Sequence, residues 1–105
     1  MPNNMRPIHP GEILREELAE IGISANTFAA AICVSANRVS KILNGTRSIT
    51  ADTALRLAKY IGTTPEFWLN LQSAYDLKIA KNSAGKKIEK EVHAYYPGTP
   101  NSAHT

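Results

Sequence analysis

The chain has 105 residues, of which 43% are hydrophobic and 20% are charged, so it can fold as one domain around a single modest core. Its single cysteine, Cys33, excludes an intramolecular disulfide framework and a cysteine-based zinc finger, and is typical of a reducing compartment. No apolar run approaches the length of about 20 residues that crosses a bilayer, and the polar start MPNNMRPIHP lacks the apolar segment of a signal peptide. These features predict a cytoplasmic protein that does not enter a membrane.

The net charge of +3 is unevenly distributed along the chain. Residues 1–33 carry a net charge of −2, residues 34–62 carry +4 and residues 63–105 carry +1. A basic segment of this kind is what a localised binding face for a polyanion requires. The charge distribution therefore directs attention to the middle of the chain.

Proline, glycine and capping residues divide most of the chain into predicted helices, with no convincing strand. The first helix begins at Pro10 and ends at Gly22, with apolar residues three and four positions apart. Ser24 can cap a short Ala-rich second helix, and Ser35 can cap a third helix that Gly45 ends. The first half of the chain therefore holds three helices.

Two more helices are expected in the second half. Thr50 can cap a fourth helix that ends at Gly62, and Thr64 with Pro65 opens a fifth helix that ends at Asn82. The following GKKIEKEVHAY can hold two or three helical turns, whereas YPGTPNSAHT contains two prolines and a glycine and is expected to be disordered or to follow a partner. The prediction is an all-α, five-helix bundle with a flexible C-terminal tail. Its parts are an N-terminal arm (residues 1–9), a helical domain (10–82) and a partly disordered C-terminal extension (83–105).

The three residues CVS join the second and third predicted helices, which is the spacing of a helix-turn-helix. Within the third helix, Val39, Ile42 and Leu43 form the inward stripe. At about 100° per residue, the other side of that helix carries only polar side chains. The outward and flanking residues are Asn37, Arg38, Ser40, Lys41 and Asn44.

A helix decorated in this way fits the major groove of B-DNA, where Arg or Lys recognises guanine and Asn recognises adenine through paired hydrogen bonds. Asn37 and Arg38 lie in the first turn, which usually reaches base edges. Later positions are better placed for phosphates, namely Lys41, Asn44, Thr46 and Arg47. The alternative is a solvated face of a helical bundle, but two Asn residues, which are mediocre helix formers, favour a binding role.

No pattern in the sequence indicates an enzyme, a metal site or a cofactor. His9, His93 and His104 lie far apart and show no metal-ligand spacing, and Cys33 is expected to fill a small space in the core. The chain has no GxGxxG or GxxxxGK[ST] loop for a nucleotide phosphate. The carboxylates of GEILREELAE line one exposed helix face.

The stretch ICVSANRVSKILNGTRSIT resembles the helix-turn-helix of Xre/Cro-like DNA-binding proteins. The flanking HPGEILREEL and ITADTALRLAKYIGTTPEFWLNLQSAYDL are similar to the HigA antitoxin family, and the likeness covers about residues 7–82. The resemblance implies a five-helix domain that dimerises, binds a palindromic operator in its own promoter and represses the operon. It also implies that the protein neutralises a HigB-type toxin, a small ribonuclease that cleaves mRNA on ribosomes.

The resemblance also adds expected DNA contacts. It places Ala36 in the groove-facing part of the helix, where it would offer at most a methyl contact. Two positions depart from relatives, since Cys33 stands where they have a Gly that favours positive φ, and Ala25 stands where many phage-type relatives have Gln. From helix geometry and resemblance together, the expected DNA-binding residues are Asn26, Thr27, Ser35, Ala36, Asn37, Arg38, Ser40, Lys41, Asn44, Thr46 and Arg47.

The fifth predicted helix offers more apolar surface than one helix needs to cover a small bundle. A twofold dimer would bury the surplus and place two recognition helices about 34 to 36 Å apart, one turn of DNA. The alternative is that these side chains complete the core of the monomer. The expected homodimer interface consists of Phe67, Trp68, Leu69, Leu71, Tyr75 and Leu77.

Three functions remain open on the sequence. The expected partners of the first are double-stranded operator DNA and a HigB-type toxin, as in an antitoxin that is also a repressor. The second is a stand-alone helix-turn-helix regulator without a toxin partner, and the third is a protein-interaction module for which DNA is irrelevant. The surface that meets a toxin is not identified, and residues 1–9 and 83–105 are candidates.

Overall fold

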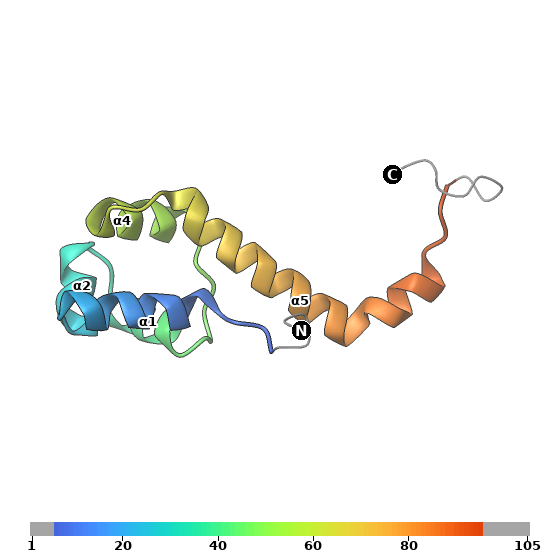
Figure 1. Cartoon of the computed structure of the whole chain (residues 1–105), viewed down its shortest axis with the longest axis horizontal. Coiled ribbons are helices and arrows are strands. Elements are labelled where there is room, and N and C mark those ends of the chain that lie inside the picture. Colours follow the sequence, from blue (N-terminus) through green and yellow to red (C-terminus); the bar gives the residue numbers. More distant parts are fainter. Residues whose placement is uncertain (1–5, 96–105) are drawn as a thin grey trace.

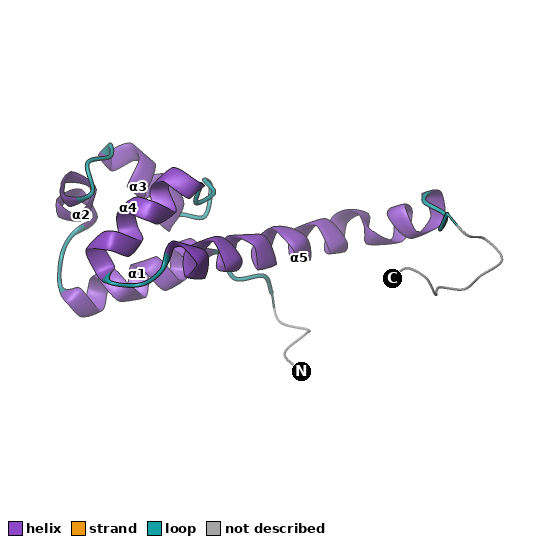
Figure 2. Cartoon of the chain, turned by 90° about the horizontal axis from the view of Figure 1, so that it is seen from above, coloured by secondary structure: helices purple, strands orange, loops and turns teal. Residues whose placement is uncertain are grey.

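The computed structural model describes residues 6–95, which form five helices and no strand. The helices are α1 (Pro10–Ile21), α2 (Ala25–Ala31), α3 (Ala36–Leu43), α4 (Ala51–Ile61) and α5 (Pro65–Glu91). Helices α1 to α4 and the first part of α5 pack into a body, from which the rest of α5 projects (Figures 1 and 2). The predicted all-α, five-helix fold is confirmed. Expectations for residues 1–5 and 96–105 lie outside the described residues.

Four helices begin at the capping residues that the sequence predicts. Ser24, Ser35, Thr50 and Thr64 each accept a hydrogen bond from a backbone N–H in the first turn of the helix that follows. Helix α1 begins differently, because His9 Nδ1 accepts a bond of 2.9 Å from the Gly11 N–H. Histidine is not a preferred N-cap, so this cap was not predicted.

The core of the body joins residues from all five helices and from the loop before α4. Its buried apolar residues are Leu14, Leu18, Phe28, Ala29, Ile32, Val39, Ile42, Ile49, Ala54, Leu57, Ala58 and Trp68. Trp68 is 0% exposed, and its Nε1 donates a 2.7 Å hydrogen bond to Thr63 Oγ1. Its assignment to the dimer interface was therefore wrong, because the monomer already surrounds this side chain. Gln72 Oε1 accepts a 2.8 Å bond from the Ile49 N–H and so ties α5 to that loop.

Helices α1 and α3 approach each other at a glycine. A Cβ atom built on Gly11 would overlap the backbone carbonyl oxygen of Ile42 on α3. Gly11 is therefore required for close packing of α1 against the helix that carries the polar face.

Helix α5 is longer than predicted, since it continues past Asn82 to Glu91. The Ser83 hydroxyl donates to the Ile79 carbonyl oxygen at 3.0 Å, so this serine is accommodated within the helix. The surrounding Lys and Glu residues are good helix formers, and one glycine, Gly85, does not outweigh them. The molecule consequently extends 58 Å along its longest axis against 25 and 23 Å across it.

Candidate nucleic-acid interface

The turn between α2 and α3 is held by backbone hydrogen bonds. The Cys33 N–H donates to Ala30 at 3.2 Å, and the Val34 N–H donates to Ala29 at 3.0 Å. Cys33 has φ +61°, which agrees with the expectation of a positive φ at this position. Its side chain is exposed, so the expectation that it fills the core was wrong. The left-handed conformation is the reason, because it directs the side chain of the turn residue away from the body.

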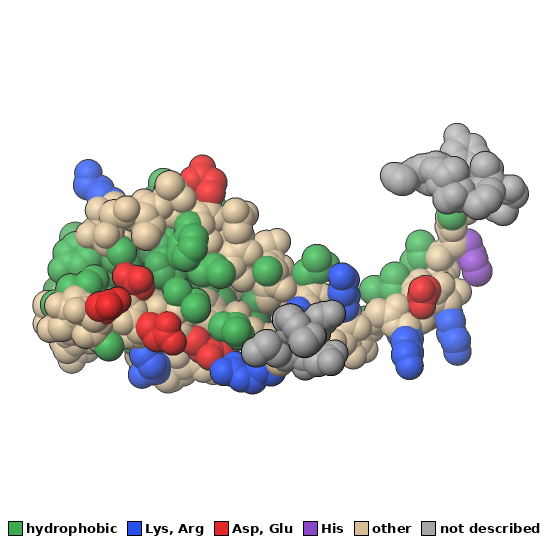
Figure 3. Space-filling view, in the orientation of Figure 1, with side chains coloured by type: hydrophobic (Ala, Val, Ile, Leu, Met, Phe, Trp, Pro, Cys, Tyr) green, Lys and Arg blue, Asp and Glu red, His purple; other side chains and the backbone are tan. Residues whose placement is uncertain are grey.

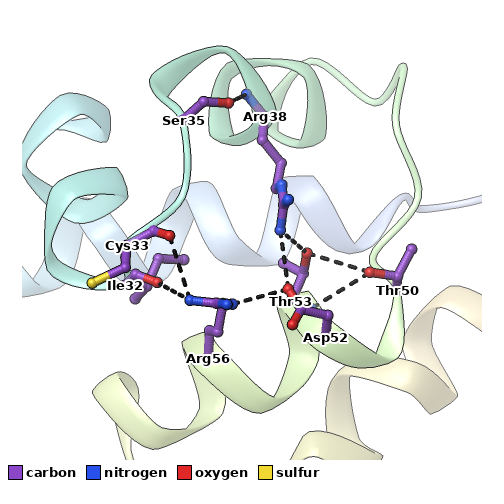
Figure 4. A network of polar contacts seen from close by, with 8 residues as sticks. All are labelled: Ile32, Cys33, Ser35, Arg38, Thr50, Asp52, Thr53 and Arg56. Atoms are coloured by element: carbon purple, nitrogen blue, oxygen red, sulfur yellow. Dashed lines mark hydrogen bonds and ion pairs between the residues drawn. The ribbon is translucent and has the colours of Figure 1, made fainter.

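Arg56 on α4 also stabilises this turn. Its Nη1 donates to the carbonyl oxygens of Ile32 at 3.1 Å and Cys33 at 3.4 Å, and its Nε donates to Asp52 Oδ2 at 2.9 Å (Figure 4). The carbonyls at the end of α2 are therefore satisfied by a charged side chain from another helix. This role of Arg56 could not be predicted from the sequence, since the contact joins residues more than twenty positions apart.

Helix α3 has the two-sided character that its sequence predicts. Val39 and Ile42 are buried, and Leu43 is half-buried against the core. Ala36, the first residue of the helix, is exposed. The exposed residues expected to bind DNA are Asn26, Thr27, Ser35, Ala36, Asn37, Ser40, Lys41, Asn44, Thr46 and Arg47. The structure thus brings these residues to the surface on α2, on α3 and in the loop after α3.

Arg38 differs from its neighbours, because its side chain reaches across to α4 (Figure 4). Nη1 donates to Asp52 Oδ2 at 3.1 Å and to Thr53 Oγ1 at 3.3 Å. The Arg38 side chain is 28% exposed, whereas that of Asp52 is 58% exposed. Hydrogen bonds from Arg56 and Arg38 hold the pKa of Asp52 below its ordinary value, so the carboxylate is ionised at neutral pH. Asp52 thereby links the third and fourth helices.

The loop after α3 is anchored by His9. Gly45 ends the helix with φ +81° and lies against the His9 ring, while the Thr46 N–H donates to Lys41 at 2.9 Å. The His9 ring also packs edge to face on Tyr75 of α5, with centroids 4.8 Å apart. Burial lowers the pKa of His9, although Asp76, Glu12 and a hydrogen bond with the backbone of Arg47 oppose this effect. His9 therefore connects α1, α5 and the loop that carries two expected phosphate contacts.

The described residues contain neither a group of potential metal ligands nor a membrane-spanning helix. Between residues 6 and 95, no group of three His, Cys, Asp or Glu side chains could hold a metal ion. None of the helices in that range is long and apolar enough to cross a membrane. What the body does present is a short exposed helix behind a tight turn, which defines a helix-turn-helix protein.

Comparison with known proteins agrees with this class and narrows it. Residues 14–68 match the helix-turn-helix family HTH_3. The solved structure of a HigA-family addiction module antidote protein from Coxiella burnetii is 67% identical, with a TM-score of 0.84 over 87% of this chain and 100% of that chain. The solved structure of the Pseudomonas aeruginosa antitoxin HigA with the higBA promoter is 49% identical, with a TM-score of 0.83 over 87% and 100% of the two chains. Antitoxin HigA-1 of Vibrio cholerae is 45% identical over 78 residues, which are 73% of each chain.

These similarities extend along most of the chain and agree with its fold. The chain belongs to the HigA antitoxin family of helix-turn-helix proteins. This family is a class of helix-turn-helix proteins rather than a class of enzymes.

Proposed function

We propose that this protein is an antitoxin that binds operator DNA as a homodimer, represses its own operon and neutralises a HigB-type toxin. The observation that carries this proposal is the exposed polar face of α3, presented behind a tight turn. Its support from relatives is the identity of 49% to a HigA whose structure was solved with promoter DNA. Binding to a promoter would place the protein in the cytoplasm of a bacterial cell.

In this proposal, α3 enters the major groove with its N-terminal turn toward the base edges. Asn37 is exposed there and can bond adenine through its side-chain amide. Lys41 and Arg47, further along the chain and also exposed, contact phosphates. Asn26 and Thr27, near the start of α2, contact phosphates of the DNA backbone in this proposal.

Dimerisation is assigned to the distal part of α5, residues 77–91. Leu77 is 57% exposed and Ile88 is 51% exposed, and their separation of eleven residues places them on one helix face. Figure 3 shows hydrophobic side chains continuing from the body onto this projecting part of the molecule. Phe67 also remains exposed, whereas Leu69 and Leu71 already pack against the core of the monomer. A second copy would bury the exposed face.

The DNA-binding part of the proposal is tested with the protein's own upstream DNA and a scrambled duplex of equal length. Fluorescence anisotropy should show weaker binding to the scrambled duplex, and affinity for both should fall steeply with salt. Asn37→Ala should lose about 1 to 3 kcal/mol of discrimination, since it removes one base contact. Asn70→Ala removes an exposed Asn from α5, outside residues 77–91, and serves as the matched control. Equal binding of the unmodified protein to both duplexes would refute sequence-specific repression.

The toxin-binding part is tested separately by co-expression with the neighbouring open reading frame. An antitoxin should co-purify with a small basic protein and restore growth to cells that express it. Absence of such a neighbour, with intact operator binding, would instead support a stand-alone regulator. If Asn37→Ala combined with Lys41→Ala left the biological activity intact, the protein would be an interaction module for which DNA is irrelevant.

A further inference from the structure

A cluster of charged and polar side chains connects the helix-turn-helix to α4. It consists of Arg38 on α3 together with Asp52, Thr53 and Arg56 on α4 (Figure 4). The Asp52 carboxylate is shared, because Oδ2 accepts from Arg38 Nη1 at 3.1 Å and from Arg56 Nε at 2.9 Å. This Asp52 cluster is the place where the turn, the polar face of α3 and the first turn of α4 meet.

We infer that Asp52 is a positioning residue that sets DNA sequence discrimination by restraining the guanidinium of Arg38. The inference rests on the proposed function, because it concerns how the α3 face distinguishes one DNA sequence from another. It assigns a role in specificity to a carboxylate, a group that phosphates repel and that therefore adds nothing to non-specific attraction.

One edge of the Arg38 guanidinium makes no hydrogen bond within residues 6–95. Within residues 6–95, the hydrogen bonds of the Arg38 side chain all start at Nη1. Nη2 and Nε therefore remain as two parallel donors, which is the arrangement that pairs with guanine O6 and N7. A restrained arginine loses less conformational freedom when it binds, and it has less reach toward nearby phosphates. Restraint by Asp52 thus favours the base contact over contacts that carry no sequence information.

Asp52 is itself held in place from the turn. Arg56, which bonds its carboxylate, also donates to the carbonyl oxygens of Ile32 and Cys33. The carboxylate also lies in the first turn of α4, where the helix dipole stabilises a negative charge. The Arg38 side chain is therefore linked, through Asp52 and Arg56, to the backbone of the turn before α3.

A simpler role for Asp52 makes a different prediction. If the carboxylate only repels phosphates, its removal strengthens binding to every DNA sequence by the same factor. If it positions Arg38, its removal strengthens binding to scrambled DNA and lowers the discrimination ratio, which is the dissociation constant for scrambled DNA divided by that for the operator. The ratio of affinities for operator and scrambled DNA therefore separates the two roles.

The experiment compares Asp52→Asn with the unmodified full chain by fluorescence anisotropy on operator and scrambled duplexes at one salt concentration. We expect the discrimination ratio to fall about fivefold, with tighter binding to the scrambled duplex. Glu66→Gln is the matched control, since Glu66 also lies in the first turn of a helix and is exposed. Its substitution removes the same charge and should leave the ratio unchanged.

A second variant separates positioning from a general structural role. Arg38→Ala alone should lower the ratio, and Asp52→Asn added to it should lower the ratio no further. Additive losses, or an unchanged ratio in Asp52→Asn while the unmodified protein discriminates, would overturn the inference and leave the proposed function standing. Failure of the unmodified protein to discriminate would overturn both. Circular dichroism melts of each variant show whether a lost ratio reflects unfolding, and a folded Asp52→Asn is expected because the side chain is 58% exposed.

Discussion

The body and the distal part of α5 differ in the exposure of their large apolar side chains. In the body, Trp68 is 0% exposed and belongs to the core that all five helices contribute to, whereas Leu77 and Ile88 on the distal part are 57% and 51% exposed. The body therefore has its own core, while the distal part gains little from burial within the monomer. The contrast is what the proposed function requires, in which the body supplies stability and the binding face and the distal part of α5 supplies a surface for a second copy.

The largest expected effect is on the body. Trp68→Ala should lower the free energy of unfolding by about 3 to 5 kcal/mol, because it leaves a cavity and removes the bond to Thr63. The neighbouring Phe67→Ala should cost far less, since Phe67 is 44% exposed. Urea denaturation of both variants measures the difference. Similar losses at the two positions would contradict the assignment of Trp68 to the core.

The next effect concerns assembly. Leu77→Ser should weaken dimerisation by about 1 to 2 kcal/mol per protomer, which is less than the value of burying a whole leucine side chain because Leu77 is 57% exposed in the monomer. The free energy of unfolding of the monomer should change little. Sedimentation equilibrium over a range of concentrations measures the dimer, with Lys86→Ser, an exposed residue of the same helix, as control. A dimer unaffected by Leu77→Ser would remove α5 from the proposed interface.

Substitution of two glycines by alanine should change the stability of the protein in opposite directions. Gly11→Ala should destabilise by about 1 to 3 kcal/mol, because its Cβ has no room against Ile42. Gly85→Ala on the distal part of α5 should stabilise by about 0.5 to 1 kcal/mol, since a Cβ there meets only Lys81 Cβ at 4.0 Å. Thermal melts of the two variants test the signs directly. A destabilising Gly85→Ala would mean that this part of α5 is not an ordinary exposed helix.

The smallest expected effect is a pH dependence. Burial lowers the pKa of His9, so below its ordinary value of about 6.5 the unfolded chain binds a proton that the folded chain does not. The free energy of unfolding should therefore be greatest above that pH and fall as pH is lowered toward the folded pKa. His9→Asn retains a side-chain acceptor for the Gly11 N–H and should flatten this part of the profile. An unchanged slope would show that His9 does not couple protonation to folding.

The sequence predicts the features that depend on neighbouring residues. Capping by Ser35 follows from local backbone chemistry, whereas a positive φ at Cys33 was implied by the Gly that relatives have there, and the structure agrees with both. The end of α5 was predicted at Asn82, nine residues too early, because the helix-forming pattern of the sequence is weak beyond that residue.

Contacts between distant residues could not be predicted in the same way. Periodicity places Arg38 on the outer face of α3, but the direction of its long side chain depends on Asp52, which another helix supplies. Similarly, adjacent Phe67 and Trp68 look alike in sequence, and only the packing of the body decides which one is buried. The predicted DNA contacts of the α3 face remain predictions.

The division of roles between the body and the distal part of α5 is tested most directly by hydrogen–deuterium exchange with and without the operator duplex. Slower exchange is expected in α2, α3 and the following loop, residues 25–47, when DNA is bound. Exchange in residues 77–91 should be unchanged, since the proposed dimer would form before DNA binds. Protection confined to residues 77–91, with no change in residues 25–47, would contradict the account.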